Sequence, residues 1–192
     1  MLKVSELKLR ISSGEVLQES LSFSINDGQL LVLEGKNGSG KSTFLRQLAQ
    51  EELTRKLDSN CQKISYLPQL AGRDFVIPLA VHEIVDFDRF NSELIQLSDQ
   101  LGVNLLKTSL WNHLSGGERQ KLLLLKVLSE EHDLLILDEP FNHLDDKSIS
   151  LVAHYLRESL KDFGLKNIVL VTHNRLGLGD FLTEQLVTCQ LK

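Results

Sequence analysis

The chain of 192 residues is long enough for one domain with a substantial hydrophobic core, and 42% of its residues are hydrophobic, as in ordinary soluble globular proteins. Its formal net charge of −5, with no basic stripe, argues against a nucleic-acid partner. The longest apolar runs are far shorter than the roughly 20 residues of a membrane span, and the N-terminus lacks the apolar core of a signal peptide. Two distant cysteines, Cys61 and Cys189, indicate no metal knuckle, and we expect a reducing cytosolic location.

Predicted strands and helices alternate along the chain. Residues 2–25 alternate apolar and polar side chains around turn signals, which predicts antiparallel strands flanking a main sheet. Several later apolar segments are apolar at consecutive positions, as in parallel strands covered on both faces. The alternation predicts an α/β fold. The predicted main-sheet strands span 29–35, 63–69, 133–140 and 167–173, and the predicted helices span 41–56, 93–102, 117–130 and 147–163.

A glycine-rich segment, GKNGSGKST at 35–43, lies between the first of these strands and the first helix. It matches the pattern G-x-x-x-x-G-K-[ST], in which glycines let successive N–H groups form an anion nest at a helix N-terminus. We expect Lys41 to reach the β- and γ-phosphates of a nucleotide and Ser42 to bind Mg²⁺. The predicted nucleotide-binding residues here are Gly35, Lys36, Asn37, Gly38, Ser39, Gly40, Lys41, Ser42 and Thr43.

Two acidic residues, Asp138 and Glu139, end the apolar segment LLILDEP. Carboxylates at the carboxyl end of a buried parallel strand are costly unless they face a cation or a ligand crevice. We expect Asp138 to join the Mg²⁺ shell. Glu139 is the candidate general base that deprotonates an attacking water.

The segment LSGGE at 114–118 places two glycines at the start of a predicted helix, where each costs about 1 kcal/mol relative to alanine. Ser115 and Glu118 have the spacing of a capping box, so the helix is predicted to begin at Ser115. Gly116 and Gly117 then leave the backbone bare at the positive end of the helix.

The order of these motifs resembles that of ATP-binding-cassette (ABC) transporter ATPases over nearly the whole chain, with LSGGE as the signature. The resemblance includes Gln69 in YLPQ, HLDD at 143–146 and VTH ending at His173. It implies an α/β fold: a RecA-like P-loop NTPase core with a mainly parallel sheet, an N-terminal antiparallel β subdomain and an inserted helical subdomain at roughly 72–130. Residues 1–192 would form a single nucleotide-binding domain.

The resemblance also implies a head-to-tail dimer that hydrolyses ATP to ADP and phosphate. Ser115, Gly116 and Gly117 would contact the γ-phosphate of the ATP held by the second subunit, with Asp145 in the loop that crosses the interface. The catalytic set would be Glu139, His173, Gln69 and Lys41, and the metal ligands Ser42, Gln69 and Asp138.

Three positions depart from the family pattern. Ile11 stands near the place of the aromatic residue that stacks on adenine, so we expect plain apolar contact there. Leu124 replaces a common alanine in the signature helix, and Phe141 stands where threonine is frequent. None of these changes removes a catalytic group.

Three kinds of ABC protein remain open. Residues 74–85, DFVIPLAVHEIV, resemble a run in zinc and manganese uptake ATPases, which favours a cytoplasmic ATPase peripheral to the inner face of the membrane, with separate permease subunits. Small exporter ATPases of the haem or cytochrome-maturation type are similar in length. The segment EPFNHLDD is similar to one in ribosome-associated translation factors, which are not transporters.

Overall fold

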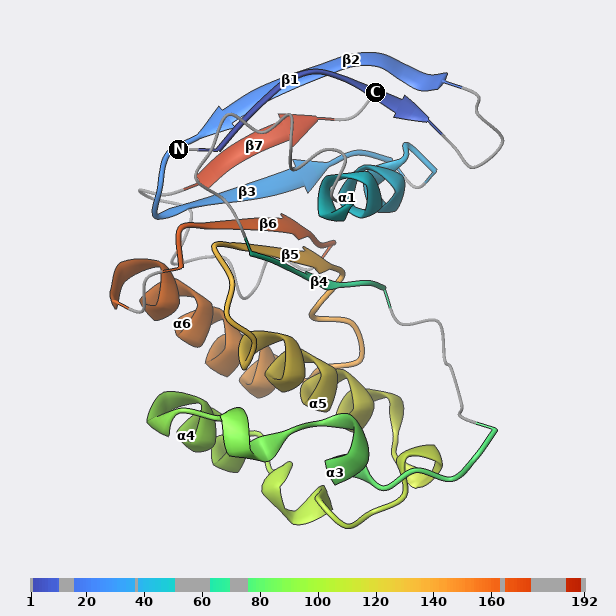
Figure 1. The fold of residues 1–192 in the computed structure, drawn as a ribbon, viewed down its shortest axis with the longest axis vertical. Coiled ribbons are helices and arrows are strands. Elements are labelled where there is room, and N and C mark those ends of the chain that lie inside the picture. Colours follow the sequence, from blue (N-terminus) through green and yellow to red (C-terminus); the bar gives the residue numbers. More distant parts are fainter. Residues whose placement is uncertain are drawn as a thin grey trace.

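The computed structural model describes residues 2–10, 16–36, 38–50, 63–69, 76–162, 165–173 and 186–190. Within these ranges the main sheet has five parallel strands in the order β4-β5-β6-β3-β7 (Figure 1). They are β3 (Gln29–Glu34), β4 (Ile64–Leu67), β5 (Leu134–Asp138), β6 (Asn167–Val171) and β7 (Leu186–Gln190). The four predicted main-sheet strands and the α/β fold are confirmed, and β7 is an edge strand that the sequence pattern did not reveal.

Both faces of this sheet are covered, which explains the consecutive apolar residues. In β3, Leu31 and Leu33 belong to one buried cluster, whereas Leu30 and Val32 belong to a second cluster on the other face. The same division by alternate residues holds in β5 and β6. Side chains of a strand alternate between faces, so a doubly covered strand must be apolar throughout.

The first face is covered by α1 (Lys41–Ala49) and by an antiparallel pair of strands, β1 (Leu2–Arg10) and β2 (Val16–Ile25). Val4 of β1 and Ile25 of β2 are buried in the same cluster as Phe44 of α1. The predicted antiparallel strands are therefore confirmed. Helix α1 ends earlier than expected because the backbone turns extended at Gln50.

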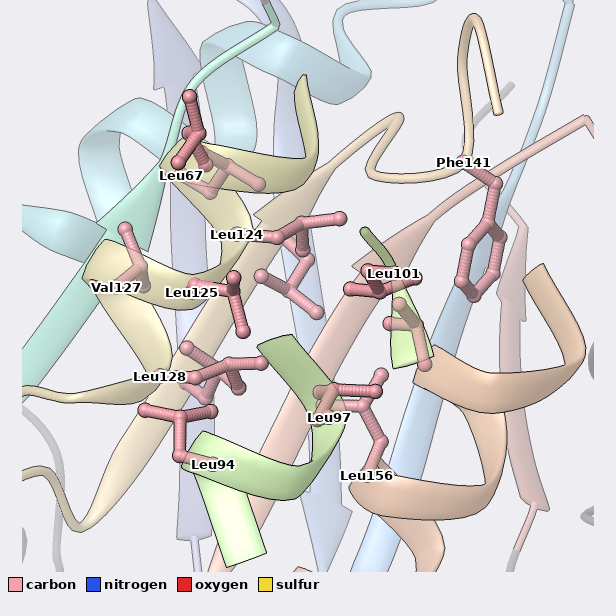
Figure 2. Close-up of a cluster of buried hydrophobic side chains, with 14 of the residues drawn as sticks. Leu67, Leu94, Leu97, Leu101, Leu124, Leu125, Val127, Leu128, Phe141 and Leu156 are labelled. Atoms are coloured by element: carbon pink, nitrogen blue, oxygen red, sulfur yellow. The ribbon is translucent and has the colours of Figure 1, made fainter. Parts of the chain in front are cut away.

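The second face is covered by α5 (Gly116–Leu128) and α6 (Asp146–Asp162), with α4 (Ser92–Gln100) packed against both (Figure 1). Leu124 and Phe141, two of the departures from the family pattern, are both buried in this cluster (Figure 2). Their larger side chains fill the core and do not enter the nucleotide site. The remaining short helices are α3 (Val81–Ile84), η1 (Phe87–Arg89), η2 (Asn104–Leu106) and η3 (Trp111–His113). Among the described helices, none combines the length and apolarity needed to cross a bilayer.

Candidate nucleotide-binding site

Strands β3 to β6 are parallel, so the loops that follow them meet at one edge of the sheet (Figure 1). These loops border a cavity of about 520 Å³. It is lined by Gly38, Gly40, Lys41, Ser42, Thr43, Gln69, Asp138, Glu139, Asn142, Val171 and His173. Nine of the eighteen predicted site residues therefore line one cavity. A second cavity, of about 340 Å³ beside Arg89 and Tyr155, contains none of them.

The glycine-rich loop turns directly from β3 into α1. Gly38 (φ 84°) and Gly40 (φ 90°) both have left-handed backbone conformations that favour glycine. Gly40 is the N-cap of α1, and the Phe44 N–H donates to the Gly40 carbonyl at 2.8 Å. The earlier N–H groups of the first turn have no intrahelical acceptor and lie at the positive end of the helix dipole. This arrangement suits a phosphate group.

Lys41 is held against the same loop. Its ammonium donates to the Gly35 carbonyl at 2.8 Å and to the Lys36 carbonyl at 3.0 Å, and the residue is 9% exposed. An ammonium carries three donors, so these two bonds leave one N–H for a ligand in the cavity. Asn37, also a predicted nucleotide-binding residue, lies outside the described residues, as does Ile11.

Asp138 ends β5 and is almost fully buried. Burial raises the pKa of its carboxyl, while hydrogen bonds from the Ser42 hydroxyl and the Gln69 backbone N–H act in the opposite direction. Among the described atoms, its buried Oδ1 has no hydrogen-bond partner. An unpaired buried carboxylate oxygen costs free energy, and a hard cation with oxygen ligands would satisfy it.

Magnesium fits this donor set. The described residues contain no group of three His, Cys, Asp or Glu side chains that could hold a metal alone. Mg²⁺ is commonly held by one or two protein ligands together with phosphate oxygens and water. Asp138 and Ser42 supply two such oxygens, and the exposed Gln69 lines the same cavity.

Glu139 occupies a strained position beside His173. Its φ of 52° is unusual for a residue other than glycine, and its N–H donates to the Val171 carbonyl at 2.9 Å. Its carboxylate lies 3.1 Å from Nε2 of His173 and accepts the His173 backbone N–H at 3.2 Å. Burial raises the pKa of Glu139, and His173 opposes this shift. A raised pKa brings a carboxylate closer to the range that suits a general base.

The signature turn is built as predicted. Ser115 is the N-cap of α5, and its Oγ accepts the Glu118 N–H at 3.3 Å. The Ser115 N–H donates in return to Glu118 Oε2 at 2.8 Å, which confirms the capping box. Residues 115–117 do not line the cavity that holds Lys41 and Glu139.

The two signature glycines differ in their surroundings. A Cβ at Gly117 would lie 2.7 Å from the His143 carbonyl oxygen, closer than real Cβ contacts allow. A Cβ at Gly116 would lie 3.7 Å from the His143 ring, an ordinary contact. Close packing within the chain is thus a reason for Gly117 that the sequence did not reveal.

Alanine substitution is expected to separate these two glycines. Gly117→Ala must move the backbone at His143 and should lower the melting temperature by several degrees, because overpacking costs about 1–3 kcal/mol. Gly116→Ala is the matched control and should melt near the parent temperature. Differential scanning calorimetry of both variants measures the difference, and equal melting temperatures would contradict the packing role of Gly117.

Asp145 caps α6 and does not line the cavity. Its carboxylate accepts the Ser148 N–H at 2.8 Å and the Ser148 hydroxyl at 2.9 Å, and these bonds lower its pKa to about 2. Lys121 of α5 lies 3.5 Å from the same carboxylate. The segment from Glu139 to Asp145 therefore joins the cavity edge to both α5 and α6.

Sequence analysis missed Asn142, which lines the cavity. Its N–H donates to the Glu139 carbonyl at 3.3 Å, so it sits in the turn that shapes the Glu139 backbone. The sequence did offer one signal for Asn142, because it is a polar residue three positions after the candidate base Glu139.

A phosphate-binding loop at a helix N-terminus, with a lysine and two buried carboxylates, defines the site of a P-loop nucleoside triphosphatase. The model of the ABC transporter family matches residues 18–142, and the chain belongs to that family. It is an ABC ATPase, which binds ATP and hydrolyses it to drive transport.

Known proteins similar to this chain include the zinc import ATP-binding protein ZnuC of Acinetobacter baylyi, at 28% identity over 91% of this chain and 68% of that protein. The ATP-binding cassette MJ0796, in a dimeric post-hydrolysis state with ADP and phosphate, superimposes with a TM-score of 0.73 at 19% identity, over 100% and 97% of the two chains. An archaeal ribosome recycling factor, aABCE1, has a TM-score of 0.73 at 25% identity, over 98% of this chain and 37% of the other.

Proposed function

We propose that this ABC ATPase powers uptake of a divalent metal ion through separate integral membrane permease subunits, to which it binds at the cytoplasmic face of the membrane. The observation that carries its ATPase role is the convergence of Lys41, Asp138 and Glu139 on one cavity. The likeness to a zinc import ATP-binding protein, together with the segment 74–85, supports metal uptake. Residues 1–192 would act as one nucleotide-binding domain with a helical subdomain at about 72–130.

Different residues of the cavity would have different roles in the reaction. The amides of the first turn of α1 and the Lys41 ammonium would bind the phosphates. Ser42, Asp138 and Gln69 would hold Mg²⁺, which neutralises charge on the β- and γ-phosphate oxygens when bound. Glu139 would take a proton from the water that attacks the γ-phosphorus, and His173 would steady Glu139 and hydrogen-bond the γ-phosphate.

A head-to-tail dimer would complete each site. Ser115, Gly116 and Gly117 form the N-terminus of α5 but do not line the cavity of their own chain. This separation supports a role at the nucleotide of a second copy, where bare amides would meet the γ-phosphate. Asp145, whose carboxylate lies close to Lys121 of the signature helix, would lie at that interface. Ile11 would contact the adenine base.

The permease would dock beside the segment that follows Gln69. Val76 and Ile77 are large apolar residues, and the first is fully exposed while the second is 70% exposed. Ala80 forms an isolated antiparallel bridge with Leu110, itself 37% exposed, which brings a third apolar side chain to this part of the surface. Clustered exposed apolar side chains of this kind mark interaction sites.

Zinc uptake by cells tests this proposal. With the natural gene replaced, a Val76→Asp/Ile77→Asp double variant should lose most uptake of radiolabelled zinc, because two buried carboxylates would oppose docking. The purified double variant should keep ATP binding. Ile95→Asp, at an exposed apolar position on α4, is the matched control and should retain uptake.

Full zinc uptake by the double variant would rule out this docking surface. If zinc uptake stayed unchanged in cells that carry Glu139→Gln, the metal assignment would fail. Co-sedimentation with ribosomes at physiological salt, together with unchanged uptake, would instead favour a non-transport ABC protein like the recycling factor.

A further inference from the structure

We propose that Gln120 is a positioning residue that ties the signature helix α5 to the turn that carries Glu139. This inference rests on the proposed role of Glu139 as the general base. Gln120 is 2% exposed, and its side-chain Nε2 donates to the Pro140 carbonyl at 2.9 Å. Pro140 directly follows Glu139, so the amide of Gln120 holds the peptide next to the base.

The turn at Glu139 needs such support. Glu139 has a left-handed backbone with φ of 52°, which persists only where the surroundings determine it. On its N-terminal side, the Glu139 N–H is bonded to Val171 of β6. Pro140 has no N–H, so its carbonyl is the backbone group through which that residue can be held. The side-chain amide of Gln120, on α5, donates a hydrogen bond to this carbonyl.

Two further contacts join α5 to the same segment. The His143 carbonyl lies against Gly117, where even a Cβ would not fit, and Lys121 lies 3.5 Å from Asp145. A displacement of the first two turns of α5 would therefore move the 140–145 segment. Because the start of α5 is proposed to contact the nucleotide of the partner, Gln120 would link that contact to the base of its own chain.

Gln120→Met tests the link, because methionine has a similar size but no donor. We expect kcat for ATP hydrolysis to fall by about 10- to 100-fold, since small displacements of a reacting group have effects of this order. The KM for ATP should change by less than about twofold, because Gln120 does not line the cavity that contains the phosphate loop.

A matched control separates positioning from stability. Asn167 is 4% exposed, and its Nδ2 donates to the Asn26 carbonyl at 2.6 Å at the opposite edge of the sheet. Asn167→Leu removes the same kind of buried bond and should lower the melting temperature without lowering kcat. If Asn167→Leu reduced kcat as much as Gln120→Met does, lost stability alone would explain the lower kcat of Gln120→Met. The positioning role of Gln120 would then be wrong.

Gln120→Glu provides a second readout. An ionised carboxylate cannot donate to the Pro140 carbonyl, whereas a protonated one can. The kcat of this variant, as a ratio to the parent at each pH, should rise as the pH falls. A flat ratio, or a Gln120→Met variant with parental kcat, would overturn the proposal. If Glu139→Gln hydrolysed ATP at the parental rate, Glu139 would not be the general base, and the proposed function itself would fail first.

Discussion

Replacing Glu139 by glutamine is expected to lower kcat for ATP hydrolysis by about 10³-fold, within the usual range for loss of a general base. An amide cannot accept the proton of the attacking water, but it keeps the size of the side chain. The loop and Lys41, which are proposed to bind the phosphates, are untouched, so the affinity for ATP should stay near that of the parent. Steady-state hydrolysis and equilibrium nucleotide binding measure the two quantities separately.

Glu93→Gln is a suitable control for this experiment, because it makes the same chemical change on the first turn of α4, away from the cavity. It should hydrolyse ATP at the parental rate. If Glu139→Gln also did so, another group would have to accept the proton, and the strained Glu139 turn would need a different explanation.

Replacing Ser115 by arginine is expected to lower kcat by about 100-fold or more, the order of effect seen when groups that stabilise a transition state are lost. The long arginine side chain would cover the exposed backbone N–H groups of Gly116 and Gly117. It would thereby block their contact with the γ-phosphate of the ATP bound to the partner subunit. Loss of the capping hydroxyl costs about 1 kcal/mol, which is too little to unfold a typical domain. Binding of ATP to the monomer should therefore persist.

The other end of the same helix supplies the control for Ser115. Ser129 is the C-cap of α5, and Ser129→Arg adds the same side chain where a positive charge suits the helix dipole. This variant should retain parental hydrolysis. Parental hydrolysis by Ser115→Arg would mean that the signature turn does not contribute to the reaction.

Local patterns predicted much of the fold because their causes are local. Runs such as LLIL require apolar neighbours on both faces, so they identified β5 and its parallel neighbours. The spacing of Ser115 and Glu118 predicted the beginning of α5, since a capping box is closed within one turn. The glycine-rich loop was equally clear, because it lies between a strand and a helix.

Other features depend on contacts between distant segments, and the sequence could not show them. Nothing local indicates that Gly117 packs on the His143 carbonyl or that Gln120 bonds to Pro140. Strand β7 was missed because its short segment, LVTCQ, carries no strong period and gains its place by pairing with β3. The proximity of His173 and Glu139 was expected only from the order of motifs in the family.

Two helix N-termini, that of α1 in one subunit and that of α5 in its partner, are proposed to bind the same triphosphate. The most direct measurement is the molecular mass in solution of Glu139→Gln with saturating ATP and Mg²⁺, compared with Glu139→Gln/Ser115→Arg. We predict that the single variant doubles its mass from the 21.7 kDa monomer only when ATP is present, and that the double variant binds ATP but stays monomeric. A double variant that dimerised with ATP as readily as the single variant would contradict the account.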